Sequence, residues 1–285
     1  MSSLRALRRR IRSVQNTQQI TKAMEMVAAA KLRRAQTRAQ AARPYAARIT
    51  AMLDRLASEA SELDHPLFKA REVRRTALVL VTSDRGLCGA YNSTLVRAAE
   101  HRLRAAEPGS LPLVLVGRKG RDYFRRRRYP VLAAHTPVPA EASLEFARTL
   151  TQDLIARFLS GEVDRVEIMF TRFVSALNRR VLVEPFLPVG AGATQRAAAG
   201  GGAIFEPDAE SIFAELLPRY ATAKLFAALA DALASEHGAR MIAMGAARKN
   251  AGELIDLLVL RRNRLRQAGI TKELLEIVGG AEALK

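Results

Sequence analysis

A seven-residue repeat of small and apolar side chains runs through the N-terminal part of the chain and limits the possible folds more than any other feature. From Leu4 to Leu63, the first and fourth positions of the repeat are Leu, Ile, Val or Ala almost throughout. A repeat sustained over so many heptads predicts a coiled-coil helix. At 1.5 Å per residue, about 55 helical residues would span roughly 80 Å, which is longer than a globular domain needs. Such a helix has to lie against a partner.

Polar residues and one proline interrupt this repeat. The frame is polar at Gln18, Thr21 and Glu25, and Pro44 lies further along the segment, between the frame positions Ala42 and Ala46. Because proline lacks the N–H that bonds to the preceding helical turn, Pro44 predicts a kink or a split in the helix.

A second helical pattern covers the chain from about residue 208 to about residue 278, with Asp208 as a candidate N-cap. Its repeat contains Gly238, Gly245 and Gly252 at seven-residue intervals. Each glycine costs ~1 kcal/mol relative to alanine in a helix interior, but small residues let two helix backbones approach closely. We therefore expect the two terminal helices to pack against each other as a long antiparallel coiled coil.

The middle of the chain has the pattern of an α/β domain. Apolar runs rich in β-branched residues at 76–82, 111–116 and 165–170 alternate with helical stretches at 93–106 and 144–160. This alternation predicts a Rossmann-like parallel-sheet domain inserted between the terminal helices, with a further strand near 180–185. The predicted domains are an N-terminal coiled-coil helix at 1–63, an α/β domain at 64–206 with a flexible loop at about 190–203, and a C-terminal coiled-coil helix at 207–285.

The charge of the chain is strongly positive. Forty-six Lys and Arg residues stand against 28 Asp and Glu residues, which gives a net charge of +18. Such a balance indicates an anionic partner: nucleic acid, acidic lipid or an acidic protein surface. No nucleic-acid-binding motif is visible, so specific nucleic-acid binding is disfavoured. A basic coiled-coil scaffold for nucleic acid or a membrane surface remains the alternative function.

The sequence gives only weak signals for catalytic residues. The segment 83–92 (SDRGLCGAYN) follows a predicted buried strand, where phosphate-binding loops occur, but it lacks both the P-loop and the dinucleotide-binding pattern. We interpret it as a tight turn in which Gly86 and Gly89 take unusual backbone angles. Cys88, the one cysteine, would need a nearby histidine to act as a nucleophile, and the four histidines show no triad or metal-ligand spacing. No cofactor, metal site or catalytic residue is predicted.

Longer motifs occur in order along nearly the whole chain. They are 8–32 (RRRIRSVQNTQQITKAMEMVAAAKL), 83–89 (SDRGLCG), 235–244 (SEHGARMIAM), 250–256 (NAGELID) and 266–280 (RQAGITKELLEIVGG). These segments resemble the signatures of the γ subunits of F-type rotary ATP synthases. Gly245, Lys249, Leu257 and Arg262 depart from the common pattern, which leaves open a divergent or alternate-ion member of that family.

The resemblance implies a rotor. In that family the coil of terminal helices turns inside a hexamer of catalytic α and β subunits and couples ion translocation to ATP synthesis or hydrolysis, without an active site of its own. It also implies an ε subunit and a membrane ring of c subunits as partners, and one copy per complex. The expected location is the cytoplasmic side of a bacterial inner membrane, as a peripheral protein.

The resemblance also implies roles for individual residues. Those expected at the catalytic ring, or where the coil meets it, are Lys22, Met24, Arg240, Arg266, Gln267 and Thr271. Glu25 joins this set for coil coupling from the heptad frame and not from the resemblance. The segment Phe205, Glu206, Pro207 and Asp208 resembles the family's foot at the ion ring, and apolar residues near 274–278 suit a bearing in a hydrophobic sleeve. From the heptad frame we further predict that Glu25 and Arg240 meet inside the coil and fix its register.

Overall fold

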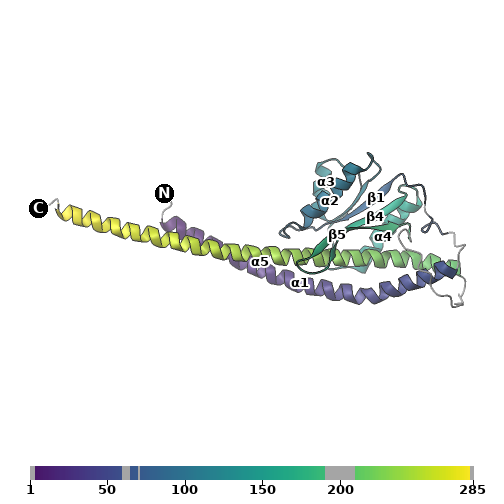
Figure 1. The fold of residues 1–285 in the computed structure, drawn as a ribbon, viewed down its shortest axis with the longest axis horizontal. Helices are drawn as coiled ribbons and strands as arrows, with labels where there is room; N and C mark the ends of the chain where they lie inside the picture. Colours follow the sequence, from purple (N-terminus) through teal and green to yellow (C-terminus); the bar gives the residue numbers. More distant parts are fainter. Residues whose placement is uncertain (1–3, 60–64, 70, 190–208, 283–285) are drawn as a thin grey trace. The chain divides into compact units, whose positions relative to one another are not determined.

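The computed structural model describes residues 4–59, 65–69, 71–189 and 209–282 (Figure 1). Its longest elements are two helices, α1 (Leu4–Glu59) and α5 (Ala209–Glu282). The chain divides into two compact units. The coil unit joins the residues up to Ala28 with those from Met241, and the α/β unit contains residues 29–240. Each long helix therefore contributes to both units.

Helix α1 continues through Pro44, so the predicted split is absent. Pro44 and Gln40 are both exposed. The Gln40 carbonyl, which loses its intrahelical donor at this proline, can therefore be hydrated by water.

The α/β unit is built on a five-stranded sheet of order β3-β2-β1-β4-β5. The first four strands of this order are parallel, and β5 runs antiparallel to β4. The strands are β1 (Thr76–Val81), β2 (Leu113–Val116), β3 (Val131–His135), β4 (Arg165–Phe173) and β5 (Arg179–Leu187). The three apolar runs and the additional strand near 180–185 are thus confirmed, whereas β3 is new.

Helices cover both faces of this sheet (Figure 1). Leu78, Leu80 and Leu115 pack against α2 (Tyr91–Ala105) and α3 (Arg118–Arg126). On the opposite face, Val79 and Val114 pack against α4 (Leu144–Leu159) and the first half of α5. Alternate residues of the same strands face the two layers, as expected for strands buried on both sides. The predicted fold class, α/β with long terminal helices, is confirmed.

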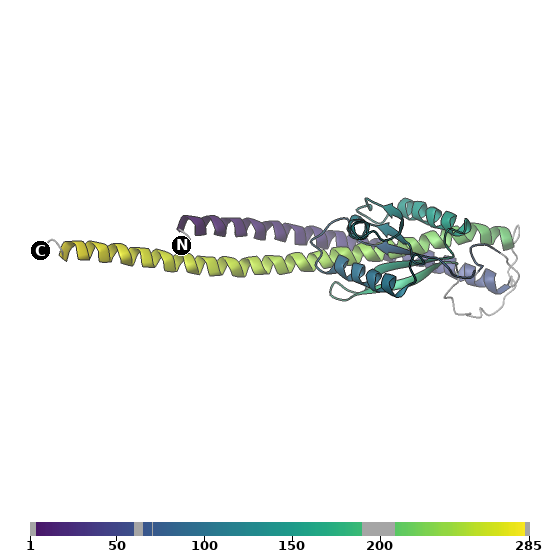
Figure 2. The same ribbon diagram turned by 90° about the horizontal axis from the view of Figure 1, so that it is seen from above.

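In the coil unit the two terminal helices lie side by side and run antiparallel (Figure 2). Leu7 and Ile11 of α1 are buried together with Leu258 of α5. A Cβ atom built on Gly252 would lie 3.0 Å from Gln18 Nε2, and one on Gly245 would lie 3.2 Å from Glu25 Oε1. Two of the three polar positions of the α1 repeat, Gln18 and Glu25, therefore face glycines of α5, which confirms that small residues bring these helices close together.

Several predictions concern residues that the structure does not describe. The flexible loop at 190–203 and the foot residues Phe205, Glu206, Pro207 and Asp208 lie outside the described residues. Among the described helices, none has an apolar stretch able to cross a lipid bilayer.

Candidate functional site

The C-terminal end of α5 is an exposed surface that no other described element of the coil unit covers. Gln18 faces Gly252, so Leu4, which lies 14 residues earlier on the antiparallel helix, is level with residue 266. Helix α5 continues past that level to Glu282 (Figure 2). Arg266, Gln267 and Thr271 are all exposed there.

Apolar side chains are exposed on the same segment. They are Ile270, Leu274, Leu275, Ile277 and Val278, with exposed fractions from 51% to 68%. Burying such side chains is worth roughly 1.5 to 3 kcal/mol each. A helix end that leaves five of them in water is suited to an apolar partner surface.

The coil seam contains an ion pair that the heptad frame did not identify. Glu25 Oε2 accepts a hydrogen bond from Arg248 Nε at 2.9 Å. Gly245 leaves the space for the Glu25 carboxylate beside it. Lys22 is exposed nearby, and Met24 is half-buried.

The predicted pairing of Glu25 with Arg240 is wrong, since the two residues have other partners. Arg240 belongs to the α/β unit, where its Nη2 atom lies 2.6 Å from Glu236 Oε1. Its guanidinium also donates to the backbone carbonyls of Gly86 and Arg85, at 3.3 and 3.4 Å. The frame placed Arg240 on the packed face of α5 but gave no information on what it packs against.

His237 completes this arrangement in its neutral form. Its Nδ1 atom lies 3.2 Å from Arg240 Nη1, and because arginine only donates, Nδ1 accepts. The other ring nitrogen then carries the proton and bonds to the Ala140 backbone. Burial, with the charges of Arg240 and Lys31, lowers the pKa of His237 to about 4.

The segment 83–90, which we call the 83–90 turn, connects β1 to α2. Gly89 has a φ of 57°, as expected, but the other unusual angle belongs to Leu87 at 61° and not to Gly86. The Asp84 carboxylate accepts from the backbone N–H groups of Arg118 and Val138, at 2.8 and 2.7 Å. An internal carboxylate thus occupies the N-terminus of α3, where a phosphate would bind in a nucleotide site.

Cys88 lacks the surroundings of a nucleophile. Cys88 is 2% exposed, and Asn92 Nδ2 lies 3.2 Å from its sulfur. Burial raises the pKa of the Cys88 thiol, which keeps it protonated and unreactive. None of its hydrogen-bond partners among the described residues is a histidine.

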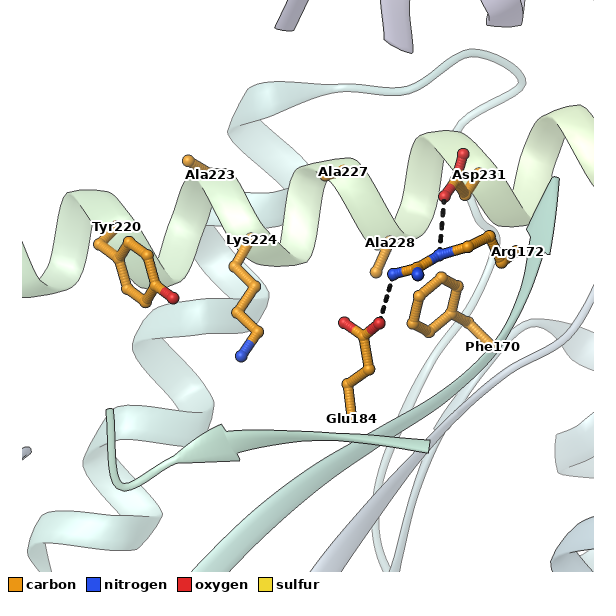
Figure 3. Close-up of a pocket in the computed structure, with 9 residues that line it drawn as sticks. All are labelled: Phe170, Arg172, Glu184, Tyr220, Ala223, Lys224, Ala227, Ala228 and Asp231. Carbon is orange, nitrogen blue, oxygen red and sulfur yellow. Dashed lines mark hydrogen bonds and ion pairs between the residues drawn. The ribbon is translucent and has the colours of Figure 1, made fainter. Parts of the chain in front are cut away.

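A pocket of about 190 Å³ lies between strands β4 and β5 and helix α5 (Figure 3). Arg172 bonds to Glu184 and lies 3.9 Å from Asp231. Lys224 Nζ donates to the Pro185 carbonyl at 2.6 Å, and burial lowers the pKa of this lysine. The charged side chains that line the pocket thus bond to one another and to the backbone. They join α5 to the edge of the sheet and are not a set of free ligands.

The described residues include no group of three or more His, Cys, Asp or Glu side chains able to hold a metal ion. The basic clusters are exposed: Arg8, Arg9 and Arg10 on α1, and the run from Arg125 to Arg128 at the end of α3. They form charged surfaces of the described residues. The exposed apolar end of α5 is therefore the candidate functional site of the described residues.

Comparisons with known proteins agree with this architecture. The family model described as ATP synthase matches residues 3–284. The ATP synthase gamma chain of Moorella thermoacetica is 48% identical over 285 residues, and that of Desulforamulus reducens is 46% identical over 285, each alignment covering 100% of both chains. Among solved structures, a chain of the Tetrahymena thermophila mitochondrial ATP synthase central stalk and c-ring is 25% identical with a TM-score of 0.65, covering 80% of this chain and 99% of that one.

A chain of the Euglena gracilis mitochondrial ATP synthase has the same fold, with a TM-score of 0.71 at 22% identity over 99% of this chain and 94% of that one. Fold and site together define a two-helix coiled-coil protein with an inserted α/β domain and an exposed helical end. The chain belongs to the ATP synthase gamma-chain family.

Proposed function

We propose that the chain is the central-stalk rotor subunit of a membrane-associated ATP synthase, which turns inside a hexamer of α and β subunits. Ion translocation through the membrane sector would drive this rotation during ATP synthesis, and ATP hydrolysis would drive the reverse. The observation that carries the proposal is the exposed apolar end of α5 on a chain matched to the family over residues 3–284. The subunit itself performs no catalysis in this account.

The physical properties of this helix end suit a bearing. Hydrophobic contacts are non-directional, so an apolar surface can turn within an apolar sleeve without breaking a fixed set of hydrogen bonds. Torque needs the opposite property, because a rotor shifts the states of the catalytic subunits only if it contacts them unequally. Arg266, Gln267 and Thr271, which are exposed at the start of this segment, supply polar groups for such unequal contacts.

The remaining predicted contact residues divide into two groups. Lys22 is exposed and Met24 is half-buried on α1, and both are proposed to contact the catalytic ring. Glu25 is proposed to couple the two helices through Arg248. Arg240 is bonded to its own α/β unit, so its proposed contribution to coupling is internal.

Further partners follow from the family. The proposal includes an ε subunit, a ring of c subunits and one copy of this chain per complex, with no specific nucleic acid. Its curated relatives named above come from bacteria, which supports a peripheral location on the cytoplasmic side of the inner membrane. Residues 205–208 are proposed to lie at the ion ring.

Co-expression with α and β subunits tests this function. The chain should co-purify in a complex that hydrolyses ATP, and the double variant L274E/L275E should assemble less or lower the ATPase activity at least severalfold. Because both leucines are exposed, the isolated variant should fold like the parent. Recovery of the chain with nucleic acid and without α and β subunits would favour the scaffold function instead.

A further inference from the structure

Helix α5 is attached to the 83–90 turn through the side chain of Arg240. The Nε and Nη2 atoms both lie 3.3 Å from the Gly86 carbonyl oxygen, and Nη2 also reaches the Arg85 carbonyl. These carbonyls lie 154 and 155 residues away in the sequence. They belong to the turn that follows β1, a central strand of the sheet. One guanidinium thus links the long helix to the carboxyl end of the sheet.

Glu236 holds this guanidinium in place. It lies one helical turn before Arg240 on α5, and its carboxylate oxygen is 2.6 Å from Arg240 Nη2. Both side chains are only 12% exposed. A charge-assisted hydrogen bond removed from water in this way is short and directional, so it fixes the position of Nη2, while His237 Nδ1 accepts from Nη1 on the same guanidinium.

The turn that Arg240 contacts is under conformational constraint. Leu87 has a positive φ, which is uncommon for a residue with a branched side chain, and its side chain is 61% exposed. The next residue, Cys88, is buried beneath the turn. Such a backbone persists only when its surroundings determine it. Arg240 holds the Gly86 carbonyl that directly precedes Leu87, and it shares the Arg85 carbonyl with Ser83 Oγ, which donates to that oxygen at 2.7 Å.

We propose that Glu236 is a positioning residue that aims Arg240 at the 83–90 turn, and that this Glu236–Arg240 latch transmits load between α5 and the sheet of the α/β unit. The second half of this proposal rests on the rotor function. A helix that turns as part of a rotor must turn its attached domain with it. Apolar packing resists separation but slides easily, whereas a charged pair bonded to backbone carbonyls also fixes position along the helix.

The buried thiol gives a direct test of the latch in the isolated full-length chain. Because Cys88 is the one cysteine of the chain, incorporation of N-ethylmaleimide measured by intact mass reports that residue alone. The parent chain should react slowly in native buffer and completely in urea. E236Q and R240A should each react at least tenfold faster in native buffer, because the turn opens without the latch.

Matched variants distinguish the loss of the latch from a general loosening of the fold. E215Q removes another i,i+4 glutamate–arginine pair of α5, Glu215–Arg219, which is exposed, and should react at the parental rate. The double variant E236Q/R240A should react no faster than R240A, because Glu236 acts through Arg240. If R240A does not fold, R240K replaces it and should react at an intermediate rate. Lysine keeps the charge, but its single nitrogen cannot reproduce contacts that Arg240 makes from both Nε and Nη2.

Three results would overturn the latch: parental reactivity in E236Q and R240A, equal acceleration in E215Q, or multiplied effects in the double variant. In the assembled ATP synthase, E236Q should lower the number of ions pumped per ATP at least twofold while ATPase activity stays within twofold. Normal pumping in E236Q would refute load transmission. Failure of the parent chain to assemble or to pump would instead refute the proposed rotor function.

Discussion

The two halves of helix α5 carry similar apolar side chains, which are buried in one half and exposed in the other. In the α/β unit, Leu225 and Leu229 are buried against the sheet and α4. Near the C-terminus, Leu274 and Leu275 have the same chemistry and are more than half exposed. The comparison teaches that hydrophobic periodicity alone does not separate a core from a docking surface. What separates them is whether another element of the same chain reaches that level.

The largest expected effect is the difference in unfolding free energy between a leucine-to-alanine substitution in the buried half of α5 and one in its exposed half. L225A should reduce the free energy of unfolding by about 2 to 5 kcal/mol, because it leaves a cavity in a packed core. L275A should change it by less than about 0.5 kcal/mol, because the side chain is 67% exposed. Urea unfolding of the isolated chain, followed by circular dichroism, measures both. A loss of several kcal/mol in L275A would show that the end of α5 is packed within the chain and is not a free surface.

The second prediction concerns pH and the buried histidine of the α/β unit. The pKa of His237 in the folded chain is about 4, below the unfolded value of about 6.5. Its stabilising contribution is therefore complete above pH 6.5 and is lost as the pH falls toward 4. The pKa difference corresponds to roughly 3 kcal/mol at most.

Unfolding free energies at pH 7, 5.5 and 4.5 test this point. The parent should lose more stability than H237Q across this range, because glutamine does not titrate. Parallel pH profiles for the two proteins would contradict the assignment of a neutral, Arg240-bonded His237. The coil unit contains no histidine, so no corresponding loss is expected from it in this range.

The smallest expected effect distinguishes the paired part of the coil from its free end. G269A should stabilise the chain by about 0.5 to 1 kcal/mol, because alanine favours the helix and the new methyl group would meet no atom within 4 Å. G245A gains the same propensity, but its methyl group would lie 3.2 Å from Glu25 Oε1. It should therefore stabilise less than G269A or destabilise. Equal stabilisation in thermal unfolding would show that the helices are not closely packed at Gly245.

The sequence predicts the parts of the fold that depend on repeated patterns. The heptad frame identified the buried face of α1, including Leu7 and Ile11, because a long helix reveals its packed side through its period. The doubly buried strands were equally visible as continuous apolar runs. Strand β3 was missed because it is an edge strand with exposed and half-buried residues. Helix α3 was missed because it is rich in arginine and buries only Gly120 and Phe124.

Side-chain partners were harder to predict than elements. The partner of Glu25 is Arg248, which lies off the heptad frame and reaches the seam through its long side chain. The carbonyls bonded by Arg240 belong to a turn more than 150 residues away, and no local pattern indicates such a contact. The exposed end of α5 was expected from the family resemblance, and its exposure follows from the register that Gly252 and Gln18 set.

Rotation of this chain within the catalytic hexamer is the most direct test of the account. A fluorescent probe can be attached through L159C, on an exposed position at the end of α4, while Cys88 stays buried. With the hexamer immobilised, addition of ATP should turn the probe continuously in one direction, and the L274E/L275E variant should turn it more slowly or stall. ATP hydrolysis by the same complexes with a stationary probe would contradict the rotor function.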